Sequence, residues 1–448
     1  MGSMNGSKIV MVGGGSYNWC PRLISDMVQT PELEKSEVIL LDPNLKAAQE
    51  VKAAAEKIAA SFKRKFKFIA TSDENSAFKG ADFVVITIST GGLEMMRHDL
   101  VIPDKYGIYQ TVGDSVGPGG WSRTLRNVPV FVKMAQKIEK LSPGAIILNY
   151  TNPMAALTGA IVAVSSLRTV GLCHGVFGTY RMLESIFGVT EKDIAMNFCC
   201  VNHFFWVLDF KIKGQDGYAM LKRKLGGKSL DSVLQSDIDN AGFLHSNHLL
   251  CDELLREYGY LTYVGDRHTC EFFNVYLTDK KMMKRFKLVR TSVEERYASL
   301  ERGRQMTLDL ATGKNAPTAR SRETAVDIMK SFVTNQPFVD VVNMPNIGQI
   351  DNLPRGAVVE TLGLVNSRGF SPISAGPLPE QLLPLVEPHC RVQQMTLDAA
   401  LKGDKELALQ ALMLDPLCAN QPPSDIRKMG LELIKATQAW LPQFQFGR

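Results

Sequence analysis

Two short segments hold the side chains best suited to chemistry in this 448-residue chain, Cys173-His174 and Asn202-His203. The first of them directly follows an apolar run at residues 169–172. A thiolate and an imidazole from separate segments can hold one divalent ion together and leave positions open for substrate oxygens. Cys173 and His203 are therefore the predicted metal ligands, although a free cysteine is more often a small core residue and a single histidine is more often structural.

A second motif lies at the N-terminus, where the apolar run Ile9–Val12 is followed by three glycines and Ser16. Such a turn lets backbone N–H groups approach a pyrophosphate at the start of a helix, although Asn18 replaces the last glycine of the usual G-x-G-x-x-G pattern. Asp42, at the end of the second predicted strand, suits a ribose diol and favours NAD over NADP, and it is equally compatible with capping the next helix. The predicted cofactor-binding residues are Gly13, Gly14, Gly15, Ser16, Asp42, Ser89 and Asn149.

The first 175 residues alternate short apolar runs with helical segments. The expected strands are Lys8–Val12, Glu37–Leu41, Lys67–Thr71, Asp82–Ile88, Ala145–Asn149 and Thr169–Leu172. The expected helices are Arg22–Gln29, Leu45–Phe62, Trp121–Lys140 and Met154–Val164. Apolar strands separated by helices indicate a buried parallel sheet, so the predicted fold class is α/β, with a doubly wound, Rossmann-like sheet.

We expect this nucleotide-binding domain to span residues 1–190 and a mixed α+β domain to span residues 191–448. In the second part, Phe204–Lys213 is a predicted strand, long helices follow it, and residues 336–384, rich in Pro and Gly, are predicted as loops. Ligands of doubly wound folds bind at the carboxyl ends of the strands, which is where the polar motifs fall.

Two further loops concentrate polar groups. Residues 113–120 are too glycine-rich for packing alone and present Asp114. Residues 265–271 crowd several ionisable side chains together, which without other context favours a salt-bridged turn. Asn149 and Asn152 end an apolar strand with two amides that suit cofactor ribose or sugar hydroxyls.

The composition is that of an ordinary globular protein, with 45% hydrophobic and 22% charged residues and a net charge of +5. Lys and Arg are scattered except at Lys63-Arg64-Lys65, which favours a solvated turn over nucleic-acid binding. No apolar run approaches the roughly 20 residues of a membrane span, and the N-terminus lacks a secretory pattern. Eight cysteines without framework spacing predict reduced thiols and a cytoplasmic protein. From the hydropathy and the scattered charge, neither a membrane nor a nucleic-acid partner is expected.

Taken together, these motifs resemble family 4 glycoside hydrolases, the NAD- and metal-dependent glycosidases. The resemblance covers nearly the whole chain and includes the segments at residues 9–16, 91–93, 102–108, 149–154, 173–176, 202–203 and 343–354. It implies hydrolysis of an α-glycoside by oxidation, elimination, addition and reduction, with NAD used catalytically and Mn²⁺ as the expected metal. The implied partner is a small glycoside, and the implied assembly is a homodimer or homotetramer.

The resemblance also implies roles for individual residues. Asp266 corresponds to the base of α-acting members, while Tyr263 or Tyr260 corresponds to the tyrosine that other members use. Asp114, slightly favoured, or His174 is the expected general acid. The expected substrate ligands are Asn152, Arg267 and His268.

The substrate is indicated by Cys173-His-Gly-Val176, a form that resembles α-glucuronidases of the family and disfavours a phosphorylated sugar. Gly175 would give room or backbone N–H access to a carboxylate, so an α-glucuronide or α-galacturonide is expected. The alternatives are a neutral-sugar α-galactosidase or α-glucosidase of the same family, an NAD-dependent 2-hydroxyacid dehydrogenase, and a non-catalytic NAD-sensing protein.

Overall fold

The N-terminal half is built on a parallel sheet, in a computed structural model that describes residues 6–234 and 248–444. Its strand order is β3-β2-β1-β4-β5-β6, the order of a doubly wound dinucleotide fold. All six predicted strands are present, as β1 (Lys8–Val12), β2 (Glu37–Leu41), β3 (Lys67–Thr71), β4 (Phe83–Ile86), β5 (Ile146–Asn149) and β6 (Arg168–Gly171). The predicted fold class is confirmed.

Helices cover both faces of this sheet because side chains alternate along each strand. In β1, Ile9 and Met11 enter one hydrophobic core, while Val10 and Val12 enter the core on the other face. The helices of this half are α1 (Cys20–Val28), α2 (Leu45–Ser61), α3 (Glu74–Phe78), α4 (Gly92–Asp104), α5 (Gly117–Leu141), α6 (Met154–Val164) and α7 (Gly175–Phe187). Helix α5 begins four residues before its predicted start.

The sheet continues into the C-terminal half with antiparallel strands. The order after β6 is β10 (Phe338–Pro345), β11 (Val358–Asn366), β7 (Ile194–Val201), β8 (Phe204–Ile212) and β9 (Gln215–Asp216), and β12 (Gly369–Pro372) pairs with β11. The prediction of loops at residues 336–384 was therefore wrong for three strands, because the Pro and Gly residues punctuate apolar strands here. Since one sheet runs through both halves, a domain boundary at residue 190 stays a prediction.

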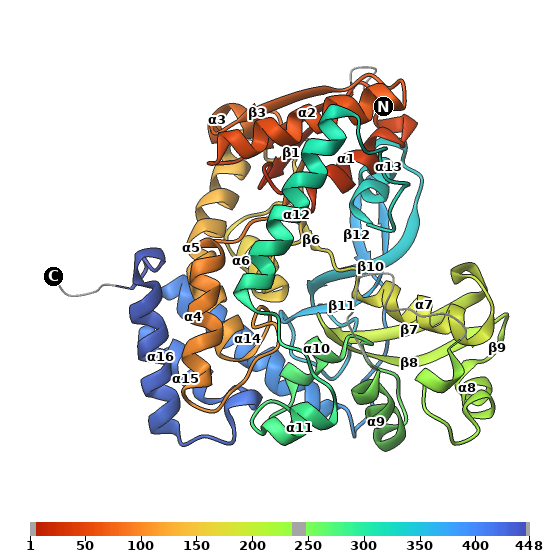
Figure 1. Cartoon of the computed structure of the whole chain (residues 1–448), viewed down its shortest axis with the longest axis vertical. Helices are drawn as coiled ribbons and strands as arrows, with labels where there is room; N and C mark the ends of the chain where they lie inside the picture. The colour runs from red at the N-terminus through yellow and green to blue at the C-terminus, as the bar shows by residue number, and fades with distance from the viewer. Residues whose placement is uncertain (1–5, 235–247, 445–448) are drawn as a thin grey trace.

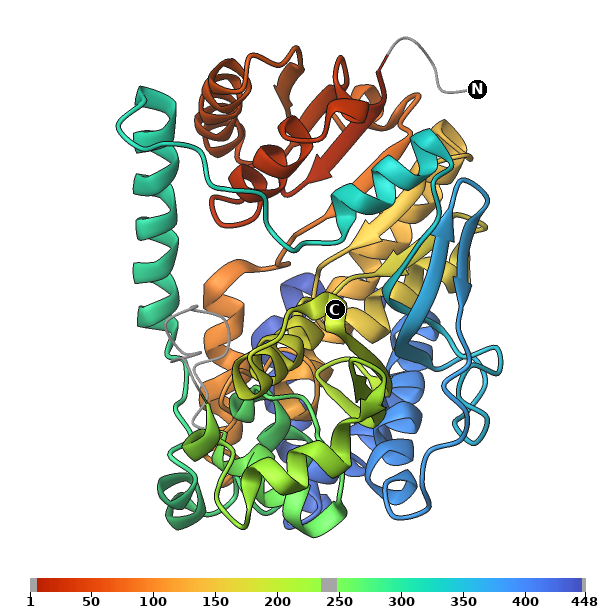
Figure 2. The same cartoon turned by 90° about the vertical axis from the view of Figure 1, so that its right-hand side faces the viewer.

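The remaining helices lie mostly around this second half, but two of them, those at residues 293–312 and 325–334, also pack against the first half (Figures 1 and 2). They are α8 (Gly217–Leu225), α9 (Leu249–Tyr258), α10 (Asp266–Thr269), α11 (Lys280–Arg285), α12 (Val293–Thr312), α13 (Ala325–Thr334), α14 (Leu383–Lys402), α15 (Lys405–Met413) and α16 (Pro423–Thr437). Short 3₁₀ helices lie at Pro31–Leu33, Glu191–Asp193, Asp231–Val233, Cys270–Phe272, Pro416–Cys418 and Gln438–Trp440. Among the helices of the described ranges, none is both long and apolar enough to cross a membrane.

Helix α12 links the two halves along the outside of the molecule (Figures 1 and 2). Near its C-terminal end, Arg304 forms an ion pair of 2.8 Å with Glu50 on α2. Near its N-terminal end, Arg296 donates to the carbonyl oxygen of Val112 at 3.4 Å. The helix therefore reaches from the nucleotide-binding half to the loop that carries Asp114.

Candidate active site

The glycine turn after β1 is packed too closely to admit larger residues. Gly13 has φ +88°, and a Cβ on Gly14 would lie 2.4 Å from the carbonyl carbon of Leu40. The N–H of Gly15 donates to Asp42 Oδ2 at 2.9 Å, and that of Asn44 donates to Asp42 Oδ1 at 2.8 Å. The turn therefore joins the ends of β1 and β2 into one wall.

This wall borders a cavity of about 730 Å³. The cavity is lined by five of the predicted cofactor residues, Gly13, Gly15, Ser16, Asp42 and Ser89, and also by Lys133, Lys137 and Trp440. Because a carboxylate has about four acceptor positions, Asp42 can still accept hydrogen bonds from a ribose diol. The cavity fits a dinucleotide.

Asn149 has a different position from the one predicted. Its amide is fully buried, donates to Thr158 Oγ1 at 3.1 Å and accepts from the N–H of Thr151 at 2.9 Å. Thr151 Oγ1 in turn accepts from the N–H of Ile88, which lines the nucleotide cavity, at 3.0 Å. Asn149 thus fixes the turn that leads to Asn152.

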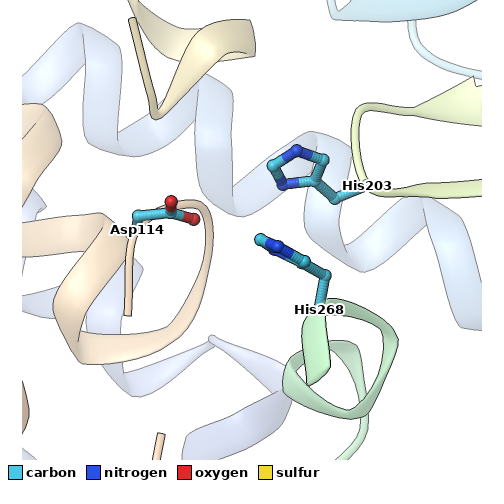
Figure 3. Close-up of side chains that lie close together, drawn as sticks. All are labelled: Asp114, His203 and His268. Atoms are coloured by element: carbon cyan, nitrogen blue, oxygen red, sulfur yellow. The ribbon is translucent and has the colours of Figure 1, made fainter. Parts of the chain in front are cut away.

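The most concentrated group of ionisable side chains is formed by Asp114, His203 and His268 (Figure 3). Each offers one ligand atom, and these atoms all lie within 4.8 Å of one another. Asp114 comes from the loop before α5, His203 from the turn between β7 and β8, and His268 from α10. Figure 3 shows the carboxylate facing the two imidazole rings.

The position of His203 results from a two-residue turn. Val201 pairs with Phe204, so Asn202 and His203 alone connect β7 to β8. His203 has φ +68°, a left-handed conformation that costs energy for a residue other than glycine. Strain of this kind is often retained where a side chain is aimed at a functional site.

The charges of the cluster suit a cation. Burial raises the pKa of Asp114, but His268, His203, Arg123 and Arg296 together more than offset this and hold the pKa below its usual value. Burial lowers the pKa of His203 to about 4 and that of His268 well below its usual value. At neutral pH the cluster therefore holds one carboxylate and two neutral imidazoles.

Ser115 indicates which nitrogen of His203 carries the proton. Its hydroxyl donates to Asp114 Oδ1 at 2.8 Å and lies 2.9 Å from His203 Nδ1. Because the single hydroxyl proton goes to the carboxylate, Nδ1 must donate to the Ser115 oxygen. Nε2 then has the free lone pair that a metal requires.

Cys173 lies outside this three-residue cluster but close to it. Its sulfur accepts from the N–H of Gly175 at 3.3 Å, and burial together with Glu360 raises the pKa of the thiol. Asn202 connects Cys173 with Glu360, because it hydrogen-bonds to Cys173 and donates to Glu360 Oε2 at 3.0 Å. Asn343 donates to the same oxygen at 2.9 Å.

Tyr263 packs between two glycines beside the cluster. A Cβ on Gly175 would lie 2.1 Å from Tyr263 Cε2, and a Cβ on Gly265 would lie 2.4 Å from Cε1. The ring centroids of Tyr263 and His203 are 5.6 Å apart. The space beside Gly175, expected to admit a sugar carboxylate, is therefore filled by the ring of Tyr263.

Four other predicted residues have partners that define their positions. Asp266 accepts from the N–H groups of Leu250 and Cys251, at 3.0 and 3.2 Å, at the start of α9. His174 Nδ1 lies 3.3 Å from Glu323, and the residue lines a second cavity of about 260 Å³. Arg267 donates to Thr291 Oγ1, while Asn152 donates to Asp114 Oδ2 at 3.4 Å.

Four buried or half-buried ionisable residues around the cluster were given no individual role from the sequence, namely Arg123, Glu271, Arg296 and Glu360, although Glu271 lies in the ionisable segment 265–271. Glu271 accepts from the N–H groups of Val112 and Gly113 at 2.7 and 2.9 Å, so it joins the loop of Asp114 to the segment of His268. The glycine-rich loop could have pointed to Arg123, which follows it directly in α5. No local pattern marks Glu360, which lies in an apolar strand.

The donor set fits a divalent metal ion. Two neutral imidazoles and one carboxylate are a common set for divalent transition metals with open coordination positions. Buried Asn152 Oδ1 and Asn202 Oδ1, which have no hydrogen-bond partner within the described ranges, provide further acceptor oxygens nearby. His203, Asp114 and His268 would hold the ion, with the Cys173 thiol close to it.

The turn at Thr151 and Asn152 joins a cavity for a dinucleotide to a cluster of two histidines and one carboxylate. This combination defines a nucleotide- and metal-dependent enzyme of the α/β class. Comparison with known proteins gives the family. The profile described as family 4 glycosyl hydrolase matches residues 8–189, and that of the family 4 glycosyl hydrolase C-terminal domain matches residues 198–418. The chain belongs to glycoside hydrolase family 4, as the sequence motifs predicted.

Two curated relatives span almost the whole chain. It is 34% identical to an α-galacturonidase of Thermoanaerobacterium saccharolyticum over 457 residues, which cover 98% of this chain and 97% of the relative. It is 31% identical to an α-galactosidase of Bacillus subtilis over 443 residues, which cover 98% and 100%. Family membership supports the glycoside hydrolase and excludes the two alternatives outside the family, the 2-hydroxyacid dehydrogenase and the NAD-sensing protein.

A solved structure of a 6-phospho-α-glucosidase from gut microorganisms, in complex with NAD and Mn²⁺, has the same fold. The two chains superpose with a TM-score of 0.81 at 21% identity, over 98% of this chain and 100% of the other.

Proposed function

We propose that this glycoside hydrolase cleaves α-linked uronides, with α-galacturonides preferred, and that it uses NAD and Mn²⁺. The observation that carries the proposal is the Asp114–His203–His268 cluster, which two consecutive residues connect to the wall of the nucleotide cavity. Thr151 bonds to Ile88 in the cavity wall, and the next residue, Asn152, bonds to Asp114. The 34% identity to an α-galacturonidase and the NAD and Mn²⁺ in the solved 6-phospho-α-glucosidase support it further.

When bound, NAD supplies a reversible hydride acceptor and Mn²⁺ supplies a Lewis acid for sugar oxygens. The residues of the chain have complementary tasks. The unpaired Oδ1 of Asn152 is placed to accept a hydrogen bond from a sugar hydroxyl. We propose Asp114 as a metal ligand instead of the general acid, because a carboxyl with a lowered pKa gives up its proton too readily to donate it.

Tyr263, as its tyrosinate, is the residue that we propose to accept the C2 proton of the sugar. Burial raises the pKa of its phenol, so loss of the phenol proton to solvent would depend on a cation held by the adjacent His203 and His268. Its ring lies against His203 and His268, with centroid distances of 5.6 and 5.7 Å. Asp266 is less well placed for this role, because the backbone of α9 binds its carboxylate. His174, which lines the second cavity, remains the candidate for protonating the leaving group.

Hydrolysis of 4-nitrophenyl α-glycosides tests the function directly. The panel contains the galacturonide, glucuronide, galactoside and glucoside, with NAD, Mn²⁺ and a thiol reductant present, and each is repeated without NAD and without Mn²⁺. We expect release from the uronides only when both cofactors are present. Release that is independent of NAD would contradict the proposed chemistry.

A neutral-sugar α-galactosidase is the second candidate, and the 31% identity to the Bacillus subtilis α-galactosidase favours it. In the same panel it would release 4-nitrophenol faster from the galactoside than from either uronide. The expected homodimer or homotetramer and the cytoplasmic location stay predictions.

A further inference from the structure

Three arginines from separate elements surround the loop that carries Asp114. They are Arg123 on α5, Arg267 on α10 and Arg296 on α12. In all three, Nε is buried and has no hydrogen-bond partner in the part of the chain that the structure describes. A buried donor left unpaired costs about 1–3 kcal/mol, and more when the group is charged, so three in one place indicate a missing acceptor.

Arg123 contrasts with Arg126, one helical turn further along α5. Arg126 is fully buried and forms a two-pronged ion pair with Asp99, with distances of 2.8 and 2.5 Å. Arg123 is 7% exposed, yet no described carboxylate forms an ion pair with it. The same helix thus holds one arginine, Arg126, that is paired with a carboxylate of the fold, and one, Arg123, that has no such partner among the described residues.

Arg267 and Arg296 contact the loop of Asp114 directly. Arg296 Nη2 donates to the carbonyl oxygen of Val112 at 3.4 Å, and the carbonyl oxygen of Arg267 accepts from Thr111 Oγ1 at 2.5 Å. Both contacts lie within three residues of Asp114. The Arg296 side chain and the Arg267 backbone are therefore anchored beside the cluster, and the Arg267 side chain donates to Thr291 Oγ1.

The local charge is not balanced within the described residues. Burial lowers the pKa of Arg123 to about 10, and Arg126 and Arg296 add to this effect as neighbouring like charges. Burial also raises the pKa of Glu271 to about 7, and backbone N–H groups already bind its carboxylate. Asp114 and the partly ionised Glu271 are buried carboxylates that face the three guanidinium groups, so an anion that pairs with the open donors would stabilise this arrangement.

We infer that Arg296, with Arg123 and Arg267, forms the subsite that recognises the carboxylate of a uronide substrate. A guanidinium presents a planar fork of donors that matches a carboxylate in a bidentate manner. This inference rests on the proposed function and adds the residues that distinguish a uronide from the neutral sugar. A sugar phosphate would satisfy the same donors, so the test separates the two anions.

The test compares the wild-type enzyme with Arg296→Gln, Arg296→Lys and the control Arg302→Gln. Arg302 is exposed on the same helix, six residues further on. Calorimetric titration with galacturonate, galactose and glucose 6-phosphate measures binding, and kcat/KM on the 4-nitrophenyl galacturonide and galactoside measures selectivity. Circular dichroism checks that each variant is folded.

We expect Arg296→Gln to weaken galacturonate binding by at least about tenfold and to lower the uronide-to-galactoside ratio of kcat/KM by at least as much. The lysine variant should retain part of both, and Arg302→Gln should match the wild type. If the wild type prefers galactoside, the proposed function fails. If the wild type prefers the uronide but Arg296→Gln keeps that preference, the carboxylate subsite is overturned while the proposed function stands. The subsite is also overturned if glucose 6-phosphate binds more tightly than galacturonate.

Discussion

The nucleotide cavity and the cluster of Asp114, His203 and His268 differ in how fully their polar groups are paired. At the cavity, Asp42 accepts from two backbone N–H groups, and the N–H of Gly14 donates to Leu41. None of the described residues that line the cavity has a buried side-chain N or O atom without a partner. Around the cluster such atoms occur in Arg123, Asn152, Asn202, Arg267, Arg296, Asn343 and Glu360.

This difference shows how each region works. The cavity is completed by the fold itself, because close backbone packing fixes its shape. The cluster is completed only when ions and substrate pair with its free donors and acceptors. Substitutions should therefore act on the cavity through sterics and on the cluster through charge and coordination.

The largest effect is expected from His203→Asn. Asparagine tolerates the left-handed backbone at this position but removes the imidazole from the cluster. We expect kcat/KM to fall on the order of a thousandfold, because the metal stabilises transition-state charge by several kcal/mol. Mn²⁺ binding, measured by electron paramagnetic resonance, should weaken in parallel.

The control is His98→Asn, on α4 and outside the cluster. It should retain Mn²⁺ binding and activity. Wild-type Mn²⁺ affinity in His203→Asn would remove His203 from the ligand set.

The same two regions differ in how well the sequence predicted them. The predicted part of the cavity wall is Gly13–Ser16 and the end of β2, two contiguous segments for which a local motif and strand order sufficed. Lys133, Lys137 and Trp440 line the same cavity from distant segments and were not predicted. The cluster joins residues 114, 203 and 268, whose proximity depends on β7 and β8 pairing beyond the parallel sheet. Sequence analysis placed all three in functional roles but made His268 a substrate ligand and Asp114 an acid, because residue type alone does not show which side chains converge.

The second effect concerns Glu360, which lies where the two halves of the sheet meet. Asn343 pairs with Gly171 on β6, and Glu360 pairs with Cys200 on β7. Burial raises the pKa of Glu360 from 4.5 to about 7, partly offset by hydrogen bonds from Asn202 and Asn343. The folded protein therefore retains this proton between pH 4.5 and 7, whereas the unfolded chain loses it.

The stability that comes from the retained proton is fully present below pH 4.5 and is lost as the pH rises through 7. The loss amounts to about 3 kcal/mol. Glu360→Gln keeps the shape and both asparagine contacts but cannot ionise. In urea unfolding, the free energy of unfolding of the variant should rise relative to that of the wild type by up to about 3 kcal/mol between pH 4.5 and 8. If the difference between the two proteins stays constant with pH, Glu360 has an ordinary pKa.

The smallest effect is expected at the cavity, from Gly14→Ala. The new Cβ would lie 2.4–2.7 Å from the backbone of Leu40 and Leu41, which cannot move without disturbing β2. We expect stability to fall by about 1–3 kcal/mol and NAD affinity, measured by fluorescence quenching, to fall about tenfold. Mn²⁺ binding should stay unchanged, because no hydrogen bond or ion pair among the described residues joins this turn to Asp114, His203 or His268.

Gly144→Ala is the matched control, since a Cβ there would meet no atom within 4 Å. It should change stability by less than about 0.5 kcal/mol and leave NAD binding intact. Equal losses in the two variants would mean that any glycine replacement weakens this half of the molecule. Loss of Mn²⁺ binding in Gly14→Ala would show that the cavity and the cluster are coupled. It would contradict the view that the fold alone shapes the cavity and that bound ions and substrate complete the cluster.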